Sequence, residues 1–151
     1  MAFRRASQGF VLLVCLTLLG SQFLLAETQT KSSNLKELGT TSIDPGDNAD
    51  VVLITNQAAN GGVYTVPSGK VFVITAVIVF PQSPGSGTLY VTLSQNSAAR
   101  DYWVLPNSQP TELTFPSGLV IAPGYSMKIY NGSSGAGSIR VLINGYVAPN
   151  N

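Results

Sequence analysis

The chain has 151 residues, only 10% of them charged, and no histidine at all. Its length suits one ordinary domain, since about 125 residues remain after a predicted signal segment, enough for one hydrophobic core. Beyond residue 26, six scattered Lys and Arg side chains face seven acids, so the basic stripe that nucleic-acid binding requires is missing and we expect no nucleic-acid partner.

The N-terminal residues 1–26 have the features of a secretory signal peptide. Arg4 and Arg5 supply a positive n-region, residues 10–19 form an apolar run, and Ala26 is a small residue at the expected cleavage point. An uncleaved anchor is the competing interpretation. Gly, Ser and Gln interrupt the apolar run directly after residue 19, however, and leave it shorter than the roughly 20 residues of a membrane-spanning helix.

Cysteine usage agrees with export. Cys15 is the only cysteine and lies in the apolar run, so the mature chain would contain no thiol and no disulfide. Export without disulfides favours a bacterial source. We therefore expect a secreted, periplasmic or cell-surface protein with no membrane span in its mature form.

Residues 27–49 are polar and short of aromatic side chains, and they end in the turn signal Asp44-Pro45-Gly46-Asp47. We predict a linker or loosely held arm here. We expect Leu35 and Leu38 either to dock on the domain or to belong to one short helical turn.

The predicted β domain covers residues 50–148. Apolar runs at 51–55 and 63–66 precede a longer run at 71–80, which is apolar on both faces. Strict alternation would place four side chains on one face and four on the other: Val71, Val73, Val77 and Val79 against Phe72, Ile74, Ile78 and Phe80. A strand of this kind is covered on both sides, so we expect it at the centre of a sheet, with a second subunit as one source of cover.

The remaining segments alternate with one apolar face each, at 88–93, 127–130 and 139–144. Turn signals separate them: Pro84-Gly85-Ser86-Gly87, Pro106-Asn107-Ser108, Pro116-Ser117-Gly118, Pro123-Gly124 and Gly132-Ser133-Ser134-Gly135. This spacing predicts an all-β sandwich or barrel of eight or nine strands.

Three stretches, 64–70, 115–129 and 141–146, resemble small jelly-roll domains of phage tail proteins and of secreted bacterial proteins. The likeness covers about residues 61–147. The resemblance implies a jelly-roll-like β-sandwich of antiparallel strands that often forms trimers, serves in attachment or assembly, and carries no catalytic residue. The predicted signal peptide departs from the phage case, because tail proteins are not usually exported in this way.

The composition removes most catalytic chemistry. Without histidine or a mature cysteine, the Ser-His-Asp arrangement, most zinc sites and thiol nucleophiles are excluded. Asp44, Asp47 and Asp50 offer oxygen ligands for calcium, but their spacing does not match an EF-hand loop, and a solvated acidic turn is the preferred interpretation. We expect no cofactor and no metal.

Charge and aromatic side chains concentrate at one place, Arg100-Asp101-Tyr102-Trp103, which holds the only tryptophan. This is the predicted ligand-binding site. Aromatic faces stack on sugar rings while charged groups bond hydroxyls, so a carbohydrate-binding module centred on Trp103 is one interpretation. The competing and preferred one is that strand alternation turns Trp103 into the core, where its large area is buried.

An enzyme would have to use carboxylates. Glycoside hydrolysis needs two acids that flank the scissile bond, and the strand region offers only Asp101 and Glu112, which nothing in the sequence brings together. We predict no catalytic residue. The leading hypothesis is an exported, non-enzymatic β-sandwich for surface recognition, attachment or assembly, with itself as partner and a surface glycan or protein as ligand.

Overall fold

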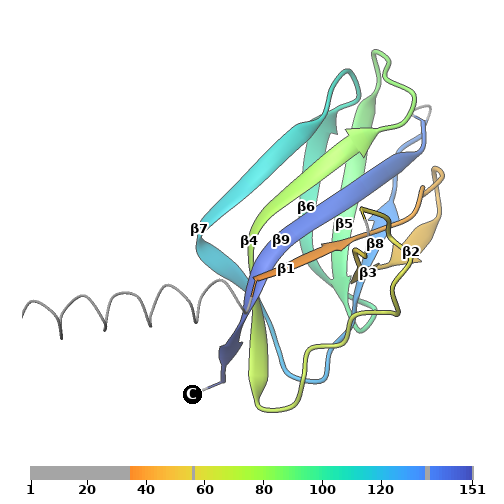
Figure 1. The fold of residues 1–151 in the computed structure, drawn as a ribbon. Coiled ribbons are helices and arrows are strands. Elements are labelled where there is room, and N and C mark those ends of the chain that lie inside the picture. The colour runs from red at the N-terminus through yellow and green to blue at the C-terminus, as the bar shows by residue number, and fades with distance from the viewer. Residues whose placement is uncertain (1–34, 56, 135–136, 151) are drawn as a thin grey trace, which may run out of the picture. The chain divides into compact units, whose positions relative to one another are not determined.

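The computed structural model describes residues 35–55, 57–134 and 137–150. The predicted signal peptide, including Cys15, and residues 27–34 of the predicted linker lie outside this part of the chain. Within it, nine strands form two antiparallel sheets that pack face to face (Figure 1), which confirms the predicted all-β sandwich. No helix among these residues has the length and hydropathy needed to cross a membrane.

The five-stranded sheet has the strand order β3-β1-β9-β4-β7, and the four-stranded sheet has the order β2-β8-β5-β6. The strands are β1 (Leu35–Gly39), β2 (Asn48–Asp50), β3 (Val52–Leu53), β4 (Lys70–Pro81), β5 (Thr88–Gln95), β6 (Ala98–Pro106), β7 (Thr111–Ile121), β8 (Met127–Asn131) and β9 (Ile139–Pro149).

The strand pairs are nested along the chain. β1 pairs with β9, β2 with β8, β4 with β7, and β5 with β6, as in one long antiparallel hairpin. The pairs β4·β9 and β5·β8 then close the two sheets. Two four-stranded sheets connected in this way are a jelly roll, to which the two-residue β3 is added at one edge.

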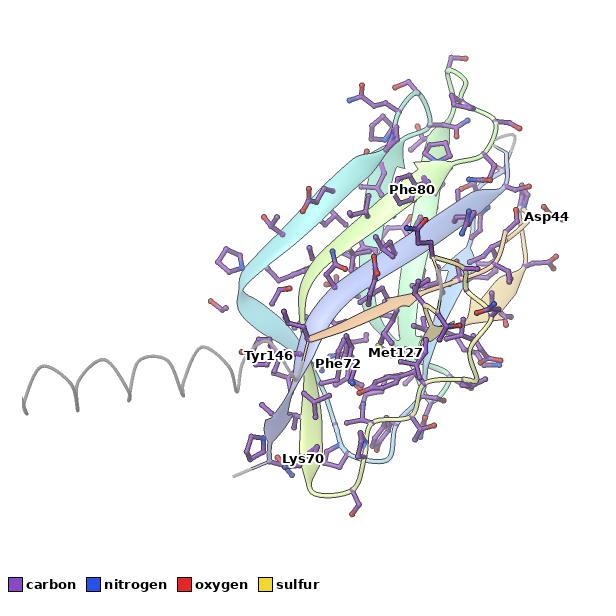
Figure 2. All side chains as sticks on the ribbon, in the orientation of Figure 1. Asp44, Lys70, Phe72, Phe80, Met127 and Tyr146 are labelled. Carbon is purple, nitrogen blue, oxygen red and sulfur yellow. The ribbon has the colours of Figure 1, made fainter. Side chains whose placement is uncertain are left out.

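The core lies between the sheets and follows the predicted alternation along β5, β8 and β9. On β5, Leu89, Val91 and Leu93 are buried while Tyr90 is exposed. The largest fully buried side chains are Phe72, Leu38, Ile43, Ile74, Leu89, Leu93, Ile121, Met127, Ile129, Ile139, Ile143 and Val51 (Figure 2 labels Phe72 and Met127). Each such side chain stabilises the fold by about 1.5–3 kcal/mol relative to an exposed one.

Strict alternation along residues 71–80 is wrong because β4 contains a β-bulge between Ile74 and Ala76. Thr75 is an extra residue that interrupts the alternation. Even-numbered side chains therefore point into the core before it, and odd-numbered ones after it. The side chains in the core cluster are Phe72, Ile74, Val77 and Val79. Those on the outer side are Val71, Val73, Ala76, Ile78 and Phe80.

The predicted linker over 27–49 is wrong from Leu35 onward, since residues 35–39 are strand β1. β1 pairs with β9, and Leu38 is fully buried in the core. The Thr40 hydroxyl then accepts a hydrogen bond from the Val141 N–H at 3.1 Å. The polar composition was misleading because a five-residue strand with one face toward the core needs few inward apolar side chains. Residues 35–39 therefore belong to the sandwich and not to a linker.

Two other local predictions were also wrong. Residues 63–66 form no strand, only the isolated bridges Val52↔Val63 and Thr65↔Ser126. Conversely, the predicted turn at residues 116–118 lies inside β7, where residues 115–118 loop out opposite the bulge of β4.

A buried asparagine ties three segments together. The Asn131 Nδ2 donates to the carbonyls of Ile43 (3.1 Å) and Gly137 (3.3 Å), and its Oδ1 accepts from the Ser133 N–H (3.2 Å). Asn131-Gly132-Ser133 matches the N-glycosylation pattern, which serves as an acceptor in surface loops. Because Asn131 is fully buried, this tripeptide has a structural role in the folded protein.

Tyr64 is the tyrosine of the core. Its ring meets Phe72 edge to face, with the centroids 5.3 Å apart. The phenol oxygen is buried without a hydrogen-bond partner among the described residues, and burial raises the pKa of Tyr64 above its ordinary value of 10.0.

Candidate functional site

The predicted site residues Arg100, Asp101, Tyr102 and Trp103 all lie on β6, but alternation sends them to different sides. Trp103 is only 8% exposed and packs in the core against Phe115, with the ring centroids 6.2 Å apart. A ligand cannot stack on it without opening the sandwich. Tyr102 is 54% exposed and faces outward.

The two charged members of the predicted site make local contacts instead of flanking Trp103. The Arg100 Nη2 donates to the Val120 carbonyl of β7 at 3.3 Å, bridging the edges of the two sheets. The Asp101 Oδ1 accepts the Tyr102 N–H at 2.8 Å. The tetrapeptide therefore contributes one exposed aromatic side chain, not a composite site.

The structure brings two further tyrosines, both outside the predicted site, to the same face as Tyr102. Tyr90 on β5 stacks on Tyr102, with ring centroids 6.3 Å apart and planes 24° from parallel. Tyr130 on β8 shares the outer face, because Thr92 pairs with Tyr102 on one side and with Tyr130 on the other. We call this outer face of the four-stranded sheet, bearing Tyr90, Tyr102 and Tyr130, the tyrosine face.

Polar residues lie beside Tyr130. A hollow of about 250 Å³ beside Tyr130 is lined by Asn48, Ser94, Ser97, Lys128 and Tyr130. The Lys128 Nζ lies 3.6 Å from a carboxylate oxygen of Asp50, so the two charges of this region largely offset each other. The tyrosine face is thus aromatic and hydroxyl-rich without a dominant charge.

The outer face of the five-stranded sheet has a different composition. Val73 pairs with both Val120 and Tyr146, and Tyr146 pairs with Leu35, so four apolar side chains form a row across four strands. Further along the same two central strands, Ile78 of β4 pairs with Leu142 of β9. We call this surface, which bears Val71, Val73, Ile78, Phe80, Val120, Leu142, Tyr146 and Leu35, the aliphatic face (Figure 2 labels Phe80 and Tyr146).

The aliphatic face contains a groove of about 310 Å³. Phe80, Leu142 and Ile54 supply apolar walls, and the charged side chains Glu37 and Arg140 also line it. Glu112, opposite Ile78, adds a second acid to the same face. Charges of both signs therefore surround the apolar surface.

The acids proposed for metal binding or catalysis do not converge. Asp101 sits opposite the buried Leu93 of its own sheet, whereas Glu112 points outward from the other sheet. The Asp44 carboxylate accepts a hydrogen bond from the Ser138 hydroxyl, and Asp50 pairs with Lys128. In the described ranges between 35 and 150, no three acidic, cysteine or histidine side chains group closely enough to hold a metal ion.

Comparison with known proteins adds no family to this description. The chain matches no protein-family model and no curated protein sequence.

Proposed function

We propose that this chain is an exported, non-enzymatic jelly-roll domain for surface recognition, attachment or assembly, and that it assembles with copies of itself through the aliphatic face. The observation that supports self-association is an apolar row across the five-stranded sheet, in which the end members Val120 and Leu35 are exposed while Val73 is already buried. The outer face of a solvated sheet is normally polar.

Covering this face with a partner is favourable in free energy. Val120 is 43% exposed and Leu35 is 61% exposed, and contact with a partner would remove both from water at about 25 cal/mol per Å² of apolar area. The surface around them carries Glu37, Glu112 and Arg140. Because both signs are present, a second copy can approach without the repulsion of a uniformly charged face.

The non-enzymatic part of the proposal has separate support. The chain contains no histidine, and Asp101 and Glu112 belong to different sheets. Export rests on Arg4, Arg5 and the apolar run at 10–19. The alternative of a carbohydrate-binding module centred on Trp103 loses support because that side chain is buried.

Light scattering after size-exclusion chromatography, at tens of micromolar protein, tests self-association. Val120→Asp and Leu35→Asp alter exposed positions, so both variants should fold and elute as monomers, whereas the unaltered protein elutes as an oligomer. Val104→Asp is the matched control, since Val104 is a valine of comparable exposure, 57%, on the other sheet.

This control variant should remain an oligomer. A monomeric unaltered protein, or dissociation by Val104→Asp to the same extent as by Val120→Asp, would contradict assembly through the aliphatic face.

A further inference from the structure

We propose that the tyrosine face binds a neutral polysaccharide, with Tyr130 and Tyr102 as stacking platforms for sugar rings and the hollow beside Tyr130 as the site for sugar hydroxyls. The inference adds a ligand to the recognition role proposed above. It uses the opposite sheet from the one proposed for assembly, so the two proposals can fail separately.

The rings of Tyr130 and Tyr102 are placed so that one sugar chain can contact both. In one row across the sheet, Tyr130 and Tyr102 flank Thr92, so their strands are two spacings, or about 10 Å, apart. Tyr102 is 54% exposed and Tyr130 is 40% exposed. Two non-adjacent rings of an extended sugar chain laid across the strands can therefore meet the two aromatic side chains.

The rings are held in place before any ligand arrives. Tyr102 stacks on Tyr90, and Tyr130 lies over the backbone of Gly132, where a Cβ would come within 2.9 Å of the Tyr130 Cε1. The Gly132 N–H donates to the Tyr90 carbonyl at 2.7 Å, which ties the two tyrosine-bearing segments together. Side chains that are already ordered lose little conformational entropy on binding.

The polar groups fit a ligand with many hydroxyls and no net charge. The hollow next to Tyr130 presents the amide of Asn48, the hydroxyls of Ser94 and Ser97, and the ammonium group of Lys128. These groups provide both donors and acceptors. Because Asp50 offsets Lys128, the face offers no electrostatic preference for an anionic polymer.

A protein partner is the competing occupant, since tyrosine is also enriched in protein interfaces. The observations favour a glycan because only one large aliphatic side chain, Val104, accompanies the tyrosines among the exposed residues of this sheet's described strands. The core of a protein interface is normally more apolar than this.

The test is native affinity electrophoresis of the full protein through gels that contain galactomannan, mixed-linkage β-glucan or dextran. A gel without polymer and a gel with the anionic polymer polygalacturonate run beside them. We expect retardation by at least one neutral polysaccharide. Tyr130→Ala and Tyr102→Ala should each weaken it about tenfold, the effect of losing one stacked ring together with its buried area.

Tyr125→Ala is the matched control, because Tyr125 is 37% exposed but lies in the segment between β7 and β8, outside the tyrosine face. Tyr130→Phe keeps the ring and should keep most of the retardation. The fluorescence of the buried Trp103 reports whether each variant is folded. The monomeric variant Val120→Asp should still be retarded if glycan binding is independent of assembly.

Three outcomes would overturn the proposal. The first is no retardation in any neutral gel, which would assign the tyrosine face to a protein partner. The second is retardation by polygalacturonate alone. The third is an equal loss of retardation in folded Tyr125→Ala and Tyr130→Ala.

Discussion

On both sheets, alternation turns every second side chain of a strand outward, but the outward side chains of the two sheets differ in chemistry. On the five-stranded sheet the outward positions hold aliphatic side chains such as Val73, Ile78 and Leu142. On the four-stranded sheet they hold tyrosines with Thr92 between them. A sandwich needs only the inner faces to be apolar for folding, so folding alone does not account for the apolar side chains on the outer face of the five-stranded sheet.

We propose that this difference corresponds to two separate roles within one small domain. An aliphatic face gains free energy when a close-packed surface covers it, and it has little to offer a hydrated ligand. A face of tyrosines and hydroxyls can stay wet and still bind through ring stacking and hydrogen bonds. The predictions below test this contrast, from the largest expected effect to the smallest.

The largest effect is expected when a charge enters each outer face. Val73 is only 8% exposed although it faces outward, so Val73→Asp buries an unpaired carboxylate and should lower the free energy of unfolding by about 3 kcal/mol or more. Thr92→Asp, at the matching central place on the tyrosine face, should lower it by about 1 kcal/mol. Urea unfolding followed by Trp103 fluorescence measures both. Equal losses of unfolding free energy in the two variants would show that Val73 and Thr92 are equally buried in the folded protein.

A smaller effect is expected at the glycine that packs on the aliphatic face. Gly118 has φ +74°, and a Cβ there would lie 2.3 Å from the Val73 Cγ1. Gly118→Ala should therefore cost the left-handed backbone strain, about 1 kcal/mol, and a further overpacking penalty of about 1 kcal/mol.

Gly124 is the matched control for this substitution. Its φ is +77°, but a Cβ there would meet nothing within 4 Å. Gly124→Ala should therefore show the backbone strain alone. Thermal unfolding of the two variants isolates the packing term, and identical losses would mean that Val73 moves aside at no cost.

The smallest effect concerns Tyr64, which lies in the core, unlike the exposed tyrosines of the tyrosine face. Burial raises the pKa of Tyr64 above 10.0, so near pH 10 the unfolded chain loses this proton while the folded chain keeps it. The resulting stability is complete below pH 10 and falls as the pH rises toward the raised folded value.

Tyr64→Phe should remove this alkaline loss. At neutral pH the substitution should change the free energy of unfolding by less than about 1 kcal/mol, because the phenol oxygen has no partner among the described residues. Urea unfolding at about pH 8 and pH 11 measures both quantities. Tyr125→Phe, at an exposed position, should leave the alkaline loss intact, and its disappearance there would contradict the assignment to Tyr64.

Much of the fold was predictable because its signals are local. Turn residues recur between the apolar segments, and alternation along residues 88–93 and 139–144 correctly placed Leu89, Val91 and Ile143 inside. The errors arose where a strand departs from simple periodicity or has a weak pattern. The bulge at Thr75 reverses the inward side of half of β4. β1 has a weak pattern because Leu38 is its only fully buried side chain.

The candidate site was less predictable than the fold. Searching for a dense run of charged and aromatic residues selected residues 100–103, but neighbours along a strand point to opposite sides. Tyr102 and Trp103 therefore separated into surface and core. Tyr90 and Tyr130 carried a usable signal, their outward position in alternating segments, but the sequence alone does not pair their strands with β6.

The sequence by itself determined that this protein is all-β, because strand period and turn chemistry are properties of neighbouring residues. It also excluded histidine chemistry, and thiol chemistry at every position except Cys15, since composition does not depend on folding. Only the tertiary structure decided the nested pairing of the strands and the convergence of three tyrosines on one sheet and of aliphatic side chains on the other. The physical reason is register: which residues become neighbours across strands depends on long-range pairing and on a single bulge, and neither leaves a local mark on the chain.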